Sequence, residues 1–216
     1  MKTKLSIITV LLGLFVNVAS AGGSAGVGYT SDYFRRGALL SEEAVQADAS
    51  LGFTASGLDA SVGIFTNQAM ASAGVDIYII NAGVSGKWGE RVSLSAGLEH
   101  AELLAGDATL EVVVGLSVDT LLTPTLSVYR DTDDALYTFE VGVSHDLDLE
   151  VATLGLGASY GNTDVTSVTN IDYYSLGAAL SRSLSDNSTL TASIAYVDSD
   201  SIENESIVGL GLSVKF

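Results

Sequence analysis

The chain lacks cysteine, has one proline and is poor in charged residues, which make up 16% of its 216 residues. Without cysteine it can form neither disulfide bonds nor thiolate metal sites, and it cannot carry a lipid anchor on a processed cysteine. An ordinary soluble domain has about 25% charged residues. Beyond residue 20 the sequence also lacks any apolar run of the roughly 20 residues that a membrane helix needs. An apolar chain without such helices can cross a bilayer only as a closed β-barrel.

Basic residues are scarce, and two of them belong to a segment with the pattern of a secretory signal peptide. Lys2 and Lys4 precede the apolar stretch Leu5 to Val18, and Ala19-Ser20-Ala21 supplies small residues for cleavage. We therefore expect residues 1–21 to be removed and residues 22–216 to form one outer-membrane barrel domain. Removal of two lysines and no acid takes the formal net charge from −17 to −19. This charge argues against nucleic acid as a partner.

The remaining sequence alternates between apolar and small polar residues with the two-residue period of β-strands. Between 108 and 118, for example, Leu110, Val112 and Val114 oppose Glu111 and Gly115. An outward Leu/Val face and an inward Gly/Ser/Thr face suit a lipid-embedded barrel, whereas a soluble sandwich packs its large apolar residues inside. The pattern predicts an all-β fold, a transmembrane antiparallel up-and-down barrel of about 12 strands. The expected strands lie near 24–35, 44–55, 58–66, 72–85, 91–100, 108–118, 124–131, 136–145, 151–161, 171–182, 189–197 and 206–216.

Several local features refine this prediction. The alternation loses phase at Ile79, Ile80 and Asn81, which predicts a β-bulge. The connections at 36–43, 100–107, 162–170 and 198–205 are longer than the others, and a periplasmic N-terminus would place them outside the cell. Tyrosines near strand ends predict an outward aromatic girdle at the membrane boundary. These are Tyr29, Tyr33, Tyr137, Tyr160 and Tyr196, with Trp88 in a short turn.

The last strand ends in Phe216 and places Val208, Leu210, Leu212 and Val214 on the same face. Such an ending resembles the C-terminal signal of bacterial outer-membrane barrels, which their assembly machinery reads. We therefore expect that machinery to be a partner through Phe216, and the lipid bilayer with its lipopolysaccharide to surround the protein.

Residues 29–37 read Tyr-Thr-Ser-Asp-Tyr-Phe-Arg-Arg-Gly and resemble the opening of the uncharacterised bacterial family Gcw_chp. The first strand of that family typically runs as T-S-D-Y, two further residues, and R-G. The positions that match are Thr30, Ser31, Asp32, Tyr33, Arg36 and Gly37, whereas Arg35 stands where the family more often has an aromatic residue. The resemblance covers roughly the first 90 residues. It implies an outer-membrane barrel and adds little about chemistry.

No catalytic or metal-binding arrangement is evident, so we do not expect an enzyme and expect no cofactor. An outer-membrane hydrolase would need a serine and a histidine side by side. The chain has two histidines, His100 and His145, which are expected at opposite ends of the barrel. Ser144 directly precedes His145, so the two side chains point to opposite faces of a strand. The acidic stretches lack the glycine and terminal glutamate of a calcium loop.

The candidate functional residues are the charged ones that the alternation directs inward: Asp32, Arg36, Asp48, Asp76, Glu99, Glu111 and Glu140. A charge facing lipid would destabilise a barrel by up to about 2–4 kcal/mol, so energy and alternation agree on this assignment. Six acids against one arginine predict an electronegative lumen, and rings of carboxylates favour cations in pores. Two hypotheses remain open. These residues line a narrow, porin-like passive channel for small solutes or cations, or they seal a non-conducting surface barrel whose acidic external loops bind a partner.

Overall fold

The computed structural model describes residues 21–55, 57–71, 74–104, 106, 108–166 and 169–216, so residues 1–20 of the expected signal peptide lie outside the described residues. The described residues form the strands β1 (Ala21–Arg35), β2 (Ala38–Ala55), β3 (Leu58–Ala69), β4 (Ile77–Trp88), β5 (Val92–Leu103), β6 (Ala108–Val118), β7 (Thr125–Asp131), β8 (Tyr137–Asp148), β9 (Thr153–Thr166), β10 (Thr169–Ser185), β11 (Ser188–Ser199) and β12 (Ile202–Lys215). The predicted all-β class and the strand number are confirmed. No helix in the described part of the chain is long and apolar enough to cross a membrane.

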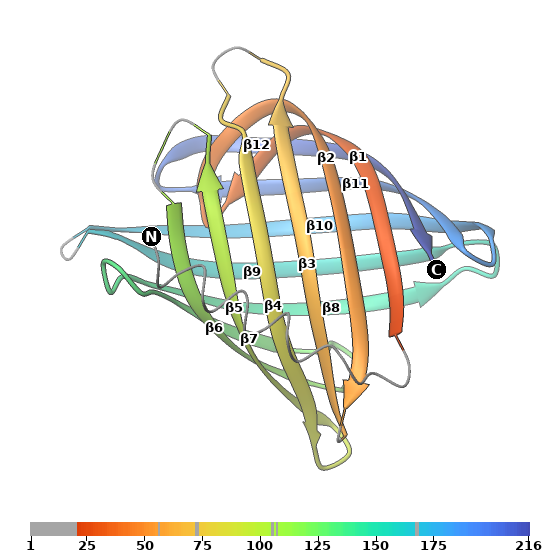
Figure 1. The fold of residues 1–216 in the computed structure, drawn as a ribbon. Coiled ribbons are helices and arrows are strands. Elements are labelled where there is room, and N and C mark those ends of the chain that lie inside the picture. The colour runs from red at the N-terminus through yellow and green to blue at the C-terminus, as the bar shows by residue number, and fades with distance from the viewer. Residues whose placement is uncertain (1–20, 56, 72–73, 105, 107, 167–168) are drawn as a thin grey trace.

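The strands form one closed antiparallel barrel in which each strand pairs with its neighbours in sequence (Figure 1). The barrel closes where β1 pairs with β12, from Ser24 opposite Lys215 to Thr30 opposite Gly209. Gly23 and Phe216 extend this seam by exchanging two backbone hydrogen bonds of 2.9 Å each. Because every strand has a partner on each side, no strand is an edge strand along its whole length.

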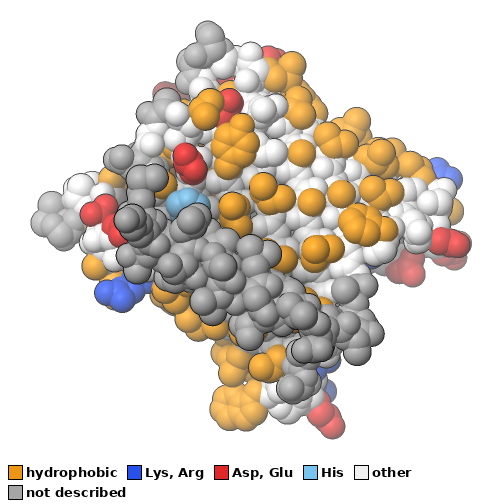
Figure 2. Space-filling view, in the orientation of Figure 1, with side chains coloured by type: hydrophobic (Ala, Val, Ile, Leu, Met, Phe, Trp, Pro, Cys, Tyr) orange, Lys and Arg blue, Asp and Glu red, His pale blue; other side chains and the backbone are white. Residues whose placement is uncertain are grey.

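The outer surface of the barrel is apolar. Val114, Leu176, Ile194 and Leu210 are each more than half exposed although they are large hydrophobic side chains. Figure 2 shows orange hydrophobic side chains spread over the visible wall, with charged side chains mainly at its margins. The residues between them along each strand are mostly small or polar and face the interior. This distribution is the one that a bilayer-spanning barrel requires.

Two local predictions are wrong. The register between β3 and β4 runs without a break from Ile77 opposite Asn67 to Ser85 opposite Asp59, so β4 has no bulge near Ile79. The sequence pattern is irregular here because Ile77 and Ile79 are large and apolar but lie on the inward face of β4, where they are buried. The predicted long connections are also absent from the hairpins β1–β2, β9–β10 and β11–β12, where the strands continue and leave only residues 36–37, 167–168 and 200–201 between them.

Candidate functional site in the barrel interior

The end of the barrel that holds the turn Arg36–Gly37, which we call the mouth, is crossed by one hairpin. β1 pairs with β12 only as far as Thr30, and β2 pairs with β3 only from Ala44 onward. Between these points the two strands pair only with each other, up to Arg35 opposite Ala38. Residues 31–43, which we call the mouth hairpin, therefore leave the barrel wall on both sides. In Figure 1 the red and orange ends of β1 and β2 curve over the top of the barrel.

The mouth hairpin bends inward at a local irregularity. Thr30 lies opposite Ala44 and Asp32 opposite Glu42, which leaves Ser31 and Glu43 between the two pairs, and Glu43 has a left-handed φ of 47°. This irregularity reverses the facing of the residues that follow, although it inserts no residue; the register of the hairpin shifts only further on, between Tyr33 and Phe34. Tyr33 therefore points into the barrel, where its ring centroid lies 5.6 Å from that of Phe65. The prediction that Tyr33 belongs to the outward aromatic girdle is wrong for this reason.

Apolar and polar contacts attach the mouth hairpin to the wall strands β3, β4 and β5. Tyr33 and Leu40 pack against the buried side chains of Ile77, Ile79 and Ala101. Asn67, which is fully buried on β3, donates a hydrogen bond of 2.9 Å to the hydroxyl of Ser41. Backbone bonds from Met70 to Glu43 and from Val75 to Leu40 add to this attachment. One side of the hairpin is thus fixed in the lumen by a small core.

Two arginines at the tip of the hairpin reach across the lumen to two glutamates on the opposite wall. Arg35 Nη2 lies 2.7 Å from Glu99 Oε1 and 3.0 Å from Glu111 Oε2. Arg36 Nη2 lies 3.1 Å from Glu99 Oε1, and Arg36 also donates to both carboxylate oxygens of Glu111. We call these four residues the mouth cluster. Their side chains are between 7% and 21% exposed, so the ion pairs are largely shielded from solvent.

The mouth cluster is electrically balanced and has aromatic support. Glu99 and Glu111 lie directly opposite each other on β5 and β6, an arrangement that is unfavourable for two like charges without cations nearby. The two arginines neutralise this pair. The guanidinium of Arg36 also lies 4.3 Å from the ring centroid of Tyr129 on β7, at a distance typical of a cation–π contact.

The turn itself is held by the opposite side of the barrel. Gly37 has a φ of 80°, and its carbonyl accepts hydrogen bonds of 2.7 Å from Ser199 and 2.6 Å from Ser201. A Cβ at Gly37 would lie 2.6 Å from the ring of Tyr173, and the Tyr173 hydroxyl donates to Glu140 at 2.5 Å. Only glycine satisfies both the left-handed backbone and this close approach.

Gly37→Ala should therefore loosen the mouth hairpin by roughly 1–3 kcal/mol, because alanine adds a clash with Tyr173 to an unfavourable backbone conformation. Hydrogen exchange of the backbone amides between Tyr33 and Ser41 measures this change. Gly57→Ala is the matched control, since Gly57 has a φ of 79° but no atom lies within 4 Å of its added Cβ. If the amides of the mouth hairpin exchanged equally fast in both variants, contact with Tyr173 would not hold the turn.

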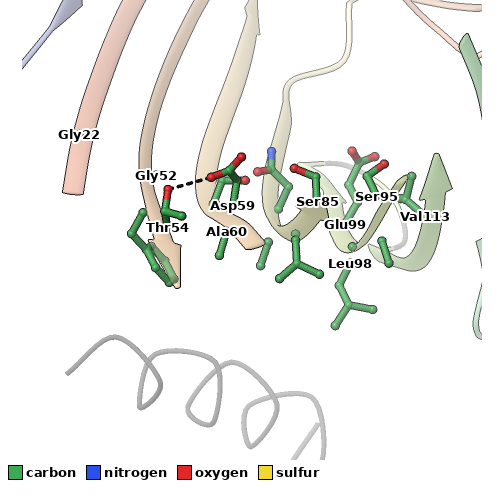
Figure 3. Close-up of a pocket in the computed structure, with 18 of the residues that line it drawn as sticks. Gly22, Gly52, Thr54, Asp59, Ala60, Ser85, Ser95, Leu98, Glu99 and Val113 are labelled. Carbon is green, nitrogen blue, oxygen red and sulfur yellow. Dashed lines mark hydrogen bonds between the residues drawn. The ribbon is translucent and has the colours of Figure 1, made fainter. Parts of the chain in front are cut away.

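Away from the mouth, the hollows of the interior include a larger and a smaller one, each lined by both polar and apolar residues. The larger has a volume of about 680 Å³, and its inward lining includes Thr54, Asp59, Asn81, Ser85 and Glu99. Figure 3 shows the side chains of Asp59, Ser85, Ser95 and Glu99 on one side of the strands and that of Leu98 on the other, together with the 2.7 Å hydrogen bond from Thr54 to Asp59. The smaller hollow, of about 270 Å³, is lined in part by Asp48.

The structure brings together some of the predicted site residues and separates others. Glu99, Glu111 and Arg36 meet in the mouth cluster, and Glu140 lies inside the barrel against Tyr173. Asp48 lies over Gly26, where an added Cβ would come within 2.5 Å of its Oδ1.

Asp32 and Asp76 have other surroundings than those predicted. Because Tyr33 and Ser41 point inward, the alternation directs Asp32 and its partner Glu42 to the outer side of the mouth hairpin, and the Asp32 carboxylate accepts a hydrogen bond from Ser31. Asp76 lies in the connection before β4, where its carboxylate accepts a bond of 2.9 Å from the amide of Ala69.

Sequence reasoning missed four inward residues: Arg35, Asp59, Tyr129 and Tyr173. Asp59 follows the outward Leu58 on β3, so strict alternation would have found it. Strict alternation would also have found Tyr129 and Tyr173, because each lies one position from an outward residue of its strand. Arg35 gave no such signal, because its facing depends on the irregularity at Ser31 and Glu43.

No arrangement for hydrolysis or metal binding is found in the part of the chain that the structure describes. His100 on β5 lies with its Nδ1 3.0 Å from the carbonyl oxygen of Thr109, and His145 lies on β8 toward the other end of the barrel. Within these same residues no three side chains of the metal-ligating kinds are grouped around one point.

Comparison with known proteins identifies the architecture. The chain matches no protein-family profile, so its resemblance to the Gcw_chp family is not confirmed, and no curated protein matches its sequence. The solved KdgM porin superposes with a TM-score of 0.61 at 13% identity, over 89% of this chain and 99% of that one. The NanC porin gives 0.59 at 11% identity, over 90% of this chain and 100% of that one. An outer-membrane channel from Pseudomonas putida F1 superposes with a TM-score of 0.56 at 11% identity, over 93% of this chain and 97% of that one.

This chain has the barrel fold of outer-membrane porins. At such low identity the similarity extends to the fold and not to individual residues. The contents of the lumen, and above all the mouth hairpin and its cluster, are therefore interpreted from this chain alone.

Proposed function

We propose that this protein is a narrow passive diffusion channel of the bacterial outer membrane that favours cations and small neutral solutes. The observation that carries the proposal is a hollow of about 680 Å³ inside a barrel whose outer wall is apolar. Carboxylates, hydroxyls and an amide belong to its lining beside apolar side chains. Glycine and serine line much of this hollow, and side chains so small cannot fill a barrel of twelve strands. The space is suited to water and small solutes.

The charge of the lining supports a preference for cations. The residues that line the two hollows include the acids Asp48, Asp59 and Glu99, and none of these lining residues is basic. Arg35 and Arg36 are turned to Glu99 and Glu111 in the mouth cluster, so they leave Asp48 and Asp59 unopposed. A structural neighbour, the KdgM porin, was solved with oligogalacturonate, an anionic sugar. The acidic lining argues for a different cargo here.

The surroundings that we propose are the bilayer and its lipopolysaccharide, reached through the assembly machinery that reads the strand ending in Phe216. The apolar outer wall supports this setting, and the backbone of Phe216 is hydrogen-bonded to Gly23 at the closing seam. We propose no cofactor and no catalytic role.

Planar-bilayer recording under a salt gradient tests the channel. We expect stepwise conductance with a reversal potential on the cation-selective side, and a shift of that potential toward zero in the Asp48→Asn/Asp59→Asn variant. Asp172→Asn is the matched control, because the carboxylate of Asp172 faces outward on β10 and accepts a hydrogen bond of 2.8 Å from the exposed Tyr160. Equal selectivity in all three proteins would contradict the proposed role of the lining acids.

A second candidate function is a non-conducting surface barrel whose acidic loops bind a partner. The mouth hairpin favours it, since a hairpin across the lumen obstructs passage. This alternative would be favoured if the inserted protein conducted no current, both with the mouth hairpin intact and with the hairpin removed.

A further inference from the structure

We infer that the mouth hairpin, residues 31–43, is the gate of the channel and that the mouth cluster is its latch. The inference rests on the proposed function, because a gate has meaning only in a conducting barrel. It reconciles two observations that otherwise conflict: a hollow with an acidic lining inside the barrel and a hairpin across its mouth.

The hairpin is built as a separate element on a bend. Wall pairing ends at Thr30 on β1 and begins again at Ala44 on β2, so outward rotation of residues 31–43 would leave the pairing of the wall strands intact. It would break the hairpin's own hydrogen bonds to Met70, Val75 and Val208. Ser31 and Glu43 at the base lie outside the regular pairing, and Glu43 has positive φ. A hinge of this kind absorbs a change in backbone angles at a few residues.

The contacts that hold the hairpin inward are mainly apolar near its base and polar at its tip. Tyr33, Leu40 and Ser41 near the base are packed on a small core and on Asn67. The tip is held by the ion pairs of Arg35 and Arg36 with the two glutamates and by the hydrogen bonds of the Gly37 carbonyl with two serine hydroxyls. Arg36 also contacts the ring of Tyr129. Water can replace each of the polar partners when the hairpin moves outward, whereas release of Tyr33, Leu40 and Ser41 from the wall is the step that a lock at the base would block.

The latch position fits a gate. Glu99 belongs both to the mouth cluster and to the lining of the larger hollow, so the cluster closes that hollow at its mouth end. The arginines approach Glu99 and Glu111 from across the lumen, since β1 has only β2 and β12 as neighbours in the barrel. Release of these pairs would open the hollow to the mouth and expose two glutamates along the path of an entering cation.

A disulfide lock tests the gate, and the absence of native cysteine makes the lock specific. The Ser41→Cys/Asn67→Cys variant places two thiols where side chains now form a hydrogen bond of 2.9 Å. In the bilayer we expect the open probability of the oxidised protein to fall at least about ten-fold, because the covalent cross-link holds the hairpin against β3, and to return when a reductant is added. Each single cysteine variant is the control for the substitutions themselves.

A shortened hairpin is the opposite test. Replacement of residues 33–41 by Asn-Gly would join Asp32 to Glu42, which already lie opposite each other, through a two-residue turn. We expect this variant to conduct continuously, with a mean current about ten-fold or more above that of the full-length hairpin, because loss of about 1.4 kcal/mol of closed-state stabilisation already shifts the equilibrium ten-fold. Its folding is checked by the heat-dependent shift of gel mobility that closed barrels show. If it does not fold, the oxidised and reduced forms of the cysteine pair decide the matter alone.

The outcomes separate the two proposals. Conductance that is the same in the oxidised, reduced and shortened proteins would overturn the gate and leave the channel intact. Silence of the folded, inserted shortened variant would overturn the channel, and the gate with it. A fall in open probability on oxidation, reversed on reduction, would support the gate.

Discussion

We expect Val114→Arg to lose about 2–4 kcal/mol of unfolding free energy in lipid vesicles, because it places a charge on the lipid-facing wall near the middle of β6. Val114 is 53% exposed and lies on the face of β6 that also carries Val112 and Leu116. In a bilayer this exposure means contact with hydrocarbon, where a guanidinium has no hydration and no partner. Denaturant titration followed by the fluorescence of Trp88, the chain's single tryptophan, measures the loss.

The neighbouring position supplies a matched control with the same residue type. Val113 lines the larger hollow and lies opposite Gly97 on β5, so an arginine there has room and water. Val113→Arg should change the unfolding free energy by less than half as much as Val114→Arg. Equal losses at both positions would contradict the assignment of the outer wall to lipid, and with it the membrane setting.

The wall of this barrel could be predicted from the sequence because the preference for apolar side chains toward lipid recurs at every second residue. A shift of one position in β6 would turn Glu111 into lipid and Val112 into the lumen, so the sequence tolerates only one facing. The same reasoning directs Glu99, Glu111 and Glu140 toward the lumen. It needed no knowledge of other strands, since each strand meets lipid on one face and lumen on the other.

The mouth could not be predicted in this way. Ser31 and Glu43 interrupt the pairing of β1 with β2, and this reverses the facing of Asp32, Tyr33 and Arg35. The interruption is favourable only because of partners far along the chain: Arg35 binds Glu99, 64 residues away, and Glu111, 76 residues away. Local alternation contains no information about such contacts. The inward Ile77 and Ile79 misled the prediction for the same reason, because they serve the hairpin and not the wall.

The mouth cluster should be the most sensitive charged site of the described chain, and removal of its cations tests this. In Arg35→Met/Arg36→Met, Glu99 and Glu111 would remain opposite each other and largely shielded, with no arginine beside them. Removal of one side of a buried ion pair typically costs about 3–5 kcal/mol, because the remaining charge is left uncompensated. The loss should be confined to the mouth hairpin, since outward movement of the tip lets water reach the carboxylates and limits the effect on the wall strands.

Hydrogen exchange resolves this distribution. We expect the amides of Phe34 and Leu39, which lie opposite each other near the tip, to exchange at least ten-fold faster in the double variant, a change of about 1.4 kcal/mol or more. Amides at the centres of β6 and β8 should keep their rates. Arg182→Met is the control for loss of an arginine as such, because Arg182 is exposed on β10 and surface substitutions usually change stability by less than about 0.5 kcal/mol.

A compensating variant distinguishes the charge from the packing of the arginines. Addition of Glu99→Gln and Glu111→Gln to the double variant removes the unpaired charges while it keeps the side-chain volumes. If charge balance is what holds the hairpin tip, most of the lost protection at Phe34 and Leu39 should return, since a shielded ion pair replaced on both sides is often neutral in stability. If protection stayed low, the guanidinium contacts themselves, including that of Arg36 with Tyr129, would be the stabilising element. The latch would then depend on arginine geometry and not on charge balance.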